Sequence, residues 1–490
     1  MRLLAAVLAL LIGPAALFAL SPVPPPQMKP CRLPGLEREA RCGASGTSRV
    51  LENRTAGNGR WLDLRIAVIP ASGTPVEPDP VVYFEGGPGG SAVDSGPGLI
   101  EEFPDALRHR DLILIDIRGA GGSGPLQCPK TEESALDSFM DPVMVRSCRE
   151  TLARDHDLSQ YTTDAIVDDV HELLSRMGYH YYKKVNLLAA SYGTRAALVF
   201  LRRHPEMVRT IHLHSVLPVD GRVPMHLAPH TQAAFDRMAA ACAAEPACRA
   251  AFPDPKADLE TVLKRLEAKP AEVPVQDKDQ KTRQTTRILR LSRNGAAQTV
   301  RYLLYRPAGA RSLPLLLRRA ASGDLVPLAQ TAWDVTGAML TSSPSGLYLS
   351  VTCAEDVAFV DPAEAARLAA GTFMGDLRVR QQTAACAEWP AAKVPASFLE
   401  PVRSSVPVLI YSGENDPGTP PEWAERVAQT LPRSRILTVP GGAHVFYGLP
   451  GVECLDRVYS DFLARGTAEG LDLETCRKSI RPLPFLTSFE

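Results

Sequence analysis

The chain has 490 residues, of which 45% are hydrophobic and 22% are charged, a balance typical of a folded globular protein. Its formal net charge is -1 at pH 7, so the composition provides no excess of positive charge for a polyanion and argues against a nucleic-acid partner. The length allows one large domain with an insertion, or two domains.

Residues 1–21 have the features of a secretory signal peptide. One arginine precedes an apolar run, and small residues and a proline-rich stretch follow it. The alternative is a retained membrane anchor, because the run approaches the roughly 20 residues that span a bilayer. We therefore expect a secreted or periplasmic protein that has no membrane contact once the signal is removed.

Ten cysteines agree with export, because disulfides persist in oxidising compartments. The sequence does not fix their connectivity. The simplest pairing joins nearest neighbours: Cys31–Cys42, Cys128–Cys148, Cys242–Cys248, Cys353–Cys386 and Cys454–Cys476. None of the couples has the paired CxxC spacing of a zinc site, so we predict no metal. We also predict no other cofactor.

Short apolar runs alternate with helical patterns over much of the chain. Residues 60–70 alternate like an antiparallel strand, whereas the later runs are continuously apolar, as in strands buried on both faces of a sheet. The continuous runs are 80–85, 111–117, 184–190, 209–216, 406–412 and 434–440. Helical patterns such as that of 162–178 separate several of them. This alternation predicts an α/β fold with a mostly parallel central sheet.

Helical patterns dominate between residues 221 and 404, with a polar, lysine-rich stretch at 276–286. The last two predicted strands follow this region. The simplest arrangement is a helical cap over the carboxyl edge of the sheet, where open α/β sheets bind ligands. We therefore predict a core formed by 48–220 and 405–478, with residues 221–404 inserted as the cap.

Ser191 lies where a predicted strand meets a predicted helix. Its surroundings, Ala189-Ala190-Ser191-Tyr192-Gly193, match the nucleophile elbow G-x-S-x-G except at Ala189. In that motif a strained turn exposes the serine Oγ atom. The alternative is an ordinary turn or helix-capping serine.

A glycine-rich loop, FEGGPGGSA at 84–92, directly follows another predicted strand. Its glycines allow backbone N–H groups to face a developing oxyanion, and we assign this role to Gly86 together with the N–H of Tyr192. A glycine-rich turn without function is the alternative interpretation.

The acid and the base are expected after the serine, in that order. Asp416 follows the strand at 406–412, with Glu414 as the lesser candidate. Nine of the ten histidines lie at or before His230, so His444 alone follows the acid. Ser191, Asp416 and His444 are therefore the predicted catalytic residues.

Five segments together resemble the α/β-hydrolase exopeptidases of the prolyl iminopeptidase and tripeptidyl aminopeptidase group: FEGGPGGS, DIRGAGGSG, ASYG, SGENDPGTPP and GGAH. The cysteine couples of the cap and tail resemble the secreted tripeptidyl aminopeptidase-like branch. The resemblance covers about residues 48 to 478. Two departures are Glu85, where iminopeptidases have histidine, and Ala189, where most have glycine.

The resemblance implies a secreted serine exopeptidase that releases short peptides or single residues from free N-termini through an acyl-enzyme. Such an enzyme must pair the substrate ammonium with carboxylates, since a buried cation without a partner is disfavoured. Glu85, Glu355 and Asp356 are the candidates, and solvated acidic residues are the alternative. An esterase or lipase of the same fold is the alternative function, and an inactive binding protein is a less favoured one.

Overall fold

The computed structural model describes residues 23–57, 59–128, 140–180, 183–277, 285–342 and 345–489. The predicted signal peptide, residues 1–21, lies outside the described residues. Among the residues described, no helix is both long and apolar enough to cross a bilayer.

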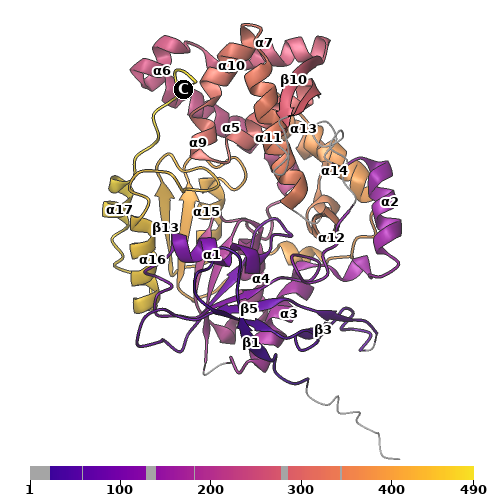
Figure 1. The fold of residues 1–490 in the computed structure, drawn as a ribbon, viewed down its shortest axis with the longest axis vertical. Coiled ribbons are helices and arrows are strands. Elements are labelled where there is room, and N and C mark those ends of the chain that lie inside the picture. Colours follow the sequence, from indigo (N-terminus) through magenta and orange to yellow (C-terminus); the bar gives the residue numbers. More distant parts are fainter. Residues whose placement is uncertain are drawn as a thin grey trace, which may run out of the picture.

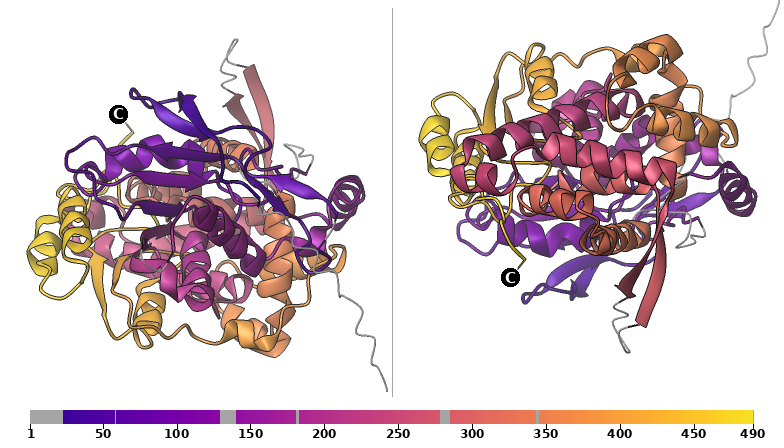
Figure 2. Two further views of the ribbon diagram at one scale, coloured as in Figure 1. Left: turned by 90° about the horizontal axis from the view of Figure 1, so that it is seen from below. Right: turned by 90° about the horizontal axis from the view of Figure 1, so that it is seen from above.

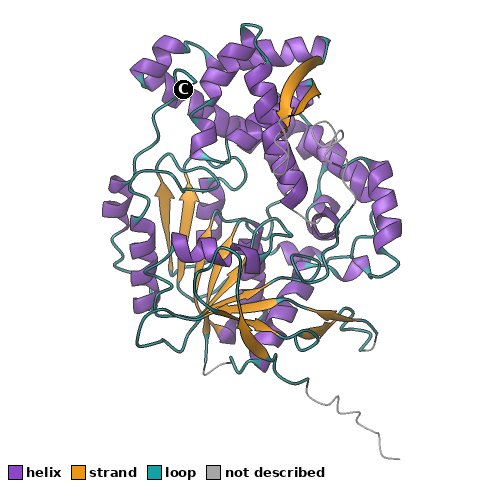
Figure 3. Cartoon of the chain, viewed as in Figure 1, coloured by secondary structure: helices purple, strands orange, loops and turns teal. Residues whose placement is uncertain are grey.

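A nine-stranded sheet forms the base of the protein, with strand order β1-β2-β5-β7-β6-β8-β9-β12-β13 (Figure 3). The strands from β7 to β13 in that order run parallel, and β1, β2 and β5 join antiparallel at one side. The predicted fold, an α/β-hydrolase type with a mostly parallel sheet, is confirmed. The bounds are β1 Met28–Cys31, β2 Ala40–Gly43, β5 Ile66–Ile69, β6 Val81–Phe84, β7 Leu112–Ile115, β8 Val185–Ala190, β9 Val208–His214, β12 Val408–Gly413 and β13 Ser434–Val439.

Helices bury both faces of the sheet, and successive side chains of each strand point to opposite faces. In β8, Leu187 and Ala189 belong to one hydrophobic cluster, and Leu188 belongs to the other. The first cluster includes residues of α3 (Thr163–Arg176), α4 (Tyr192–Arg203) and α15 (Pro421–Ala428). The second includes residues of α1 (Ala92–Glu102), α16 (Cys454–Arg465) and α17 (Leu473–Ser479). This double burial explains the continuously apolar strands.

The run at 60–70, predicted as one strand, forms two. β4 (Trp61–Asp63) pairs with β3 (Arg49–Leu51) in a separate two-stranded sheet, whereas β5 joins the main sheet. The alternating half lies in the partly exposed ribbon, and the continuously apolar half lies in the buried sheet. One apolar stretch of sequence therefore contributes strands to two different sheets.

A mainly helical part lies between β9 and β12 and has its own hydrophobic cluster. Figure 1 shows it above the carboxyl ends of the parallel strands, and Figure 2 shows its helices spread over the core. Its helices are α5 Val223–Ala244, α6 Pro246–Ala251, α7 Pro255–Ala268, α8 Arg293–Leu303, α9 Pro307–Ala310, α10 Leu313–Ala321, α11 Val326–Ser342, α12 Ser345–Glu355, α13 Pro362–Ala369 and α14 Leu377–Ala387.

This helical part also contains a β-hairpin that the sequence did not predict. β10 (Ala271–Asp277) pairs antiparallel with β11 (Thr285–Leu291), and Val273, Val275, Leu289 and Leu291 are buried in the same cluster. The ends of the polar stretch 276–286 belong to these strands, while 278–284 lies outside the described residues.

The ten cysteines form the five predicted bridges, and the structure contains no free cysteine. Nearest-neighbour pairing is therefore confirmed. Cys128–Cys148 reaches α2 (Pro142–Leu152), and Cys242–Cys248 and Cys353–Cys386 lie in the helical part.

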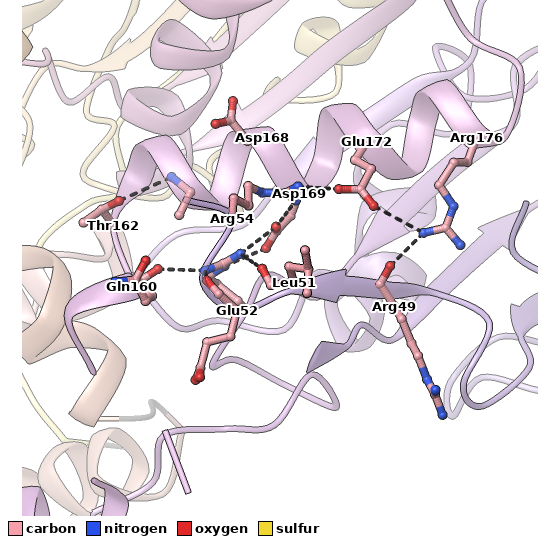
Figure 4. A network of polar contacts seen from close by, with 12 residues as sticks. Arg49, Leu51, Glu52, Arg54, Gln160, Thr162, Asp168, Asp169, Glu172 and Arg176 are labelled. Carbon is pink, nitrogen blue, oxygen red and sulfur yellow. Dashed lines mark hydrogen bonds and ion pairs between the residues drawn. The ribbon is translucent and has the colours of Figure 1, made fainter. Parts of the chain in front are cut away.

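Arg118, in the glycine-rich segment 116–124, is completely buried. Its Nε and one terminal nitrogen each donate to Asp169 of α3 at 2.7 Å. Its remaining hydrogen bonds go to the carbonyl oxygens of Leu51, Glu52 and Gln160. Figure 4 shows Asp169 and these carbonyl-bearing residues, together with Arg54, which also binds Asp169. Arg118 thus joins the loop to α3 and has a structural role.

Removing this guanidinium is expected to destabilise the fold without touching Ser191. Arg118→Met leaves Asp169 buried with Arg54 alone, so we expect the free energy of unfolding in denaturant to fall by about 3 kcal/mol. The control is Arg477→Met, since Arg477 pairs with Glu474 at the surface and its loss is expected to cost less than about 1 kcal/mol. Similar losses in the two variants would contradict the role given to Arg118.

Candidate active site

Ser191 lies between the end of β8 and the start of α4, with φ 54° and ψ -123°. Ser191 and Ser215 are the non-glycine residues with positive φ in the described part of the chain. The Ser191 side chain makes no capping hydrogen bond to α4, so it is not an ordinary helix-capping serine. Its hydroxyl is instead free to bond elsewhere.

The turn at Ser191 is possible because small residues surround it. A Cβ atom on Gly193 would lie 2.0 Å from the carbonyl oxygen of Phe84, a distance that real atoms do not reach. A Cβ on Gly86 would lie 3.1 Å from the Cβ of Ser191, so the glycine-rich loop lies directly against the serine. Ala189, which replaces the first glycine of the motif, is fully buried in β8.

His444 and Asp416 lie in line with Ser191. The His444 Nε2 atom is 2.9 Å from Ser191 Oγ, and Nδ1 is 2.8 Å from one Asp416 oxygen and 3.1 Å from the other. The structure thus brings together all three residues chosen from the sequence. Glu414 is exposed and accepts from the Gly441 backbone N–H at 2.9 Å, so it does not bind His444.

Asp416 is completely buried, and its carboxylate is fully engaged. It accepts from the backbone N–H groups of Gly418 and Thr419 and from the Thr419 hydroxyl, at 2.7, 2.9 and 2.7 Å. Burial by itself would raise the pKa of Asp416, but His444 and the Thr419 hydrogen bonds hold that pKa well below its usual range. The carboxylate therefore stays ionised beside the imidazole.

Three residues that the sequence did not predict hold the His444 loop. The Tyr305 ring, from the segment after α8, lies 4.9 Å from the His444 ring at 60°, and its carbonyl oxygen accepts from the Val445 N–H at 3.3 Å. The Ser215 hydroxyl donates to the His444 carbonyl oxygen at 2.9 Å. His214 stacks on Phe446 at 4.1 Å between ring centres. Tyr305 lies far from His444 in sequence, so no local pattern indicates this contact.

The two predicted oxyanion donors differ in whether another group already accepts their hydrogen bond. Tyr192 is the first residue of α4, where backbone N–H groups have no acceptor inside the helix. The Gly86 N–H, in contrast, donates to Glu85 Oε1 at 2.6 Å, and the other Glu85 oxygen accepts from the Ser95 hydroxyl. Glu85 therefore covers the Gly86 donor in this structure.

Glu355, at the end of α12, is completely buried in the contact between the helical part and the core. Its oxygens accept from the Thr163 N–H and hydroxyl, both at 2.6 Å, and the same hydroxyl lies 2.8 Å from the Tyr192 hydroxyl. Burial raises the pKa of Glu355 to about 7, and Arg195 and Thr163 offset this only in part.

Asp356 is also buried and binds Arg195 of α4 at 2.9 Å. The same guanidinium lies 3.9 Å from Glu355 and donates to the Gly221 carbonyl oxygen at 2.6 Å. Glu355 and Asp356 therefore lie behind the Tyr192 end of the elbow helix with protein partners, while Glu85 lies at the glycine-rich loop.

One group of described residues has the spacing of metal ligands: His171, His204 and Glu206. The two imidazole rings stack at 3.8 Å, and His204 Nε2 lies 2.9 Å from Asp168. None of these residues belongs to the line of Asp416, His444 and Ser191.

The comparison with known families agrees with this geometry. Residues 79–449, more than half of the chain, match the family described as the alpha/beta hydrolase fold. The chain belongs to this family. The family match spans the Gly86 loop, Ser191, Asp416 and His444, so every part of the candidate site lies within it.

Two curated relatives of this alpha/beta hydrolase match over most of its length. Serine protease Hip1 of Mycobacterium tuberculosis is 23% identical over 493 residues, which cover 90% of this chain and 89% of that protein. Tripeptidyl aminopeptidase of Streptomyces lividans is 24% identical over 466 residues, covering 87% and 82%. The resemblance to the tripeptidyl aminopeptidase group is thus confirmed.

A solved proline iminopeptidase from Mycobacterium smegmatis is also similar to this alpha/beta hydrolase. It has 16% identity and a TM-score of 0.43, and the match covers 86% of this chain and 98% of that chain.

The elbow geometry predicts the effect of adding one methyl group. Gly193→Ala places its Cβ against the Phe84 carbonyl, so β6 and the elbow must move apart and displace Ser191 from His444. We expect kcat/KM on any substrate to fall by about a hundredfold or more. The control is Gly98→Ala in α1, where no atom lies within 4 Å of the added Cβ and activity should stay unchanged. Full activity of Gly193→Ala would contradict the strained elbow.

Proposed function

We propose that the protein is a serine peptidase that acts on free N-termini through an acyl-enzyme. The observation that carries the proposal is the hydrogen-bonded line from Asp416 through His444 to Ser191, with Ser191 on a strained turn. This arrangement fits nucleophilic acyl transfer.

The distances support a role for each group. Ser191 Oγ attacks the scissile carbonyl while His444 Nε2 accepts its proton. The ionised Asp416 orients the imidazole through Nδ1–H and stabilises its charged form. His444 then gives the proton to the leaving amine, and water releases the acyl group by the same steps in reverse.

The oxyanion is expected to bind the N–H groups of Tyr192 and Gly86. One such donor contributes about 3 kcal/mol to the transition state in well-studied enzymes. Since Glu85 holds the Gly86 N–H in this structure, we propose that Glu85 turns away from Gly86 when substrate enters. A substrate ammonium group next to Glu85 would favour that movement.

The preference for peptides over simple esters rests on the relatives, because the same catalytic line serves both reactions. The serine protease and the tripeptidyl aminopeptidase each match over more than four fifths of this chain. We propose peptides with a free N-terminus as substrates, and an esterase is the alternative to be tested.

Recognition of the ammonium is proposed for Glu85, Glu355 and Asp356. One guanidinium, Arg195, faces both Glu355 and Asp356, and burial still raises the pKa of Glu355 despite that cation. Because Glu355 and Asp356 are buried, an ammonium reaches them only if the contact between α12 and the core opens. Glu85 is half-buried and already lies beside Gly86.

We also propose that the protein works outside the cytoplasm, secreted or in a periplasm. Five disulfides distributed over the core and the helical part support this location, because such bridges persist in oxidising compartments.

Substitutions in the catalytic line are expected to abolish turnover and leave the fold intact. Ser191→Ala, His444→Ala and Asp416→Asn should each lower kcat by about 10⁴-fold, and the losses should not add in double variants. Steady-state kinetics measures them, with circular dichroism as the check of folding. The matched control is Glu414→Gln, which should change kcat by less than about threefold, since Glu414 does not reach His444. If Glu414→Gln were as damaging as Asp416→Asn, the acid would be misassigned.

An exopeptidase must distinguish a free from a blocked N-terminus. We expect the parent enzyme to cleave free peptides and to spare their N-acetylated forms. Glu85→Gln, Glu355→Gln and Asp356→Asn should each raise KM for free peptides. Glu355→Gln and Asp356→Asn should barely change hydrolysis of an acyl ester without an amine.

The control for these variants is Glu267→Gln, since Glu267 is an exposed acid on α7 of the same helical part. This variant should change neither KM for free peptides nor the hydrolysis of the ester. Undiminished cleavage of acetylated peptides, or equal losses on peptide and ester, would refute the exopeptidase proposal and favour the esterase.

A further inference from the structure

Arg301, on α8 of the helical part, is only 5% exposed. Its guanidinium lies over the Tyr302 ring, 3.9 Å from the ring centre, and 5.2 Å from the centre of the Tyr305 ring. Its Nε donates to Gln298 at 3.0 Å, and a terminal nitrogen donates to the Tyr305 hydroxyl at 3.0 Å. Aromatic rings and neutral oxygens thus hold this cation.

No carboxylate among the described residues lies within ion-pair distance of Arg301, which sets it apart from the other deeply buried arginines near the core. Arg118 binds Asp169, and Arg195 binds Asp356. A guanidinium stays protonated at any physiological pH, and a buried cation normally has an anionic partner. The arrangement around Arg301 lacks one negative group.

The position of Arg301 indicates where that group comes from. The Tyr305 hydroxyl accepts from Arg301, and the Tyr305 ring contacts the His444 ring. In the proposed reaction His444 hands its proton to the leaving amine, so the leaving part of the substrate passes the imidazole that Tyr305 covers. Arg301 is therefore separated from His444 by a single side chain, that of Tyr305.

We propose that Arg301 binds a carboxylate of the substrate on the leaving-group side of the scissile bond. The planar guanidinium matches a carboxylate with two parallel hydrogen bonds, and Tyr302 and Tyr305 keep it in a fixed orientation. The inference rests on the proposed peptidase function and specifies its substrate class: peptides with a carboxylate close after the cleaved bond. The carboxylate is either the C-terminus of a short peptide or an acidic side chain.

The parent enzyme tests the inference without any variant. Three peptides share a free N-terminus and the residues before the cleaved bond: one ends in a C-terminal carboxylate, one in the amide, and one in the amide with glutamate directly after the bond. We expect kcat/KM to be at least about tenfold higher for one or both of the carboxylate peptides than for the neutral amide. The better of the two identifies the source of the carboxylate. Equal values for all three would overturn the inference.

Variants then assign the preference to Arg301. Arg301→Met keeps an apolar side chain over Tyr302 and should remove the preference, whereas Arg301→Lys should retain part of it. The matched control is Arg306→Met, an exposed arginine of the same segment, which should leave the preference intact. An equal loss on charged and neutral peptides in Arg301→Met would indicate a structural role and overturn the inference.

The same design separates failure of this inference from failure of the proposed function. If peptides are cleaved without a preference for carboxylate, the inference fails and the peptidase stands. If no peptide is cleaved but acyl esters are, the peptidase proposal fails. Inhibition of ester hydrolysis by an N-acetylated amino acid, compared with its amide, then tests Arg301 directly. Equal inhibition by the two, or inhibition unchanged in Arg301→Met, would overturn the inference.

Discussion

Ser191 adopts a backbone conformation that costs an ordinary residue of the order of 1–3 kcal/mol, and the neighbouring elements hold it there. The Ser191 N–H donates to the His214 carbonyl oxygen of β9, and the Thr194 hydroxyl donates to the Ser191 carbonyl oxygen. Gly86 and Gly193 lie so close that neither tolerates a side chain without movement. The strained turn directs Oγ toward His444, and Asp416 lies on the far side of the His444 ring.

The helical part completes the site through polar contacts that reach the elbow from two directions. Glu355, at the end of α12, accepts from Thr163, whose hydroxyl also lies 2.8 Å from the Tyr192 hydroxyl. Asp356, the next residue, binds Arg195 of α4. From the end of α8, Tyr305 contacts the His444 ring. The helical part is therefore bound to the helix that begins at the nucleophile and to the loop that carries the base. A movement of the helical part relative to the core would therefore displace both the elbow helix and the His444 loop.

Local sequence patterns predicted the elements whose environment is uniform along their length. The parallel strands are buried on both faces, and the candidate catalytic groups follow strand ends in the chain order that this fold requires. The run at 60–70 was predicted as one strand because its single apolar pattern does not reveal that Trp61 and Ile66 belong to different sheets. The hairpin of β10 and β11 was missed because its strands are half exposed and enclose a polar stretch.

Most partners of the site residues do not follow from local sequence patterns. Asp416 was chosen over Glu414 from its place in the turn, but the partners that keep it ionised become visible only when Thr419 and His444 are placed together. No motif indicates that the Tyr305 ring contacts His444 or that Glu85 binds the Gly86 N–H. The Tyr305 contact depends on the packing of distant segments, and the Glu85 hydrogen bond depends on the conformation of the glycine-rich loop.

In the proposed reaction His444 activates Ser191, and covalent labelling of the serine measures that activation. The folded protein is treated with a fluorophosphonate, and the modified residue is located by mass spectrometry of its peptides. We expect a single adduct on Ser191 that forms much more slowly in His444→Ala. An adduct on another serine, or labelling of Ser191 at the same rate without His444, would contradict it.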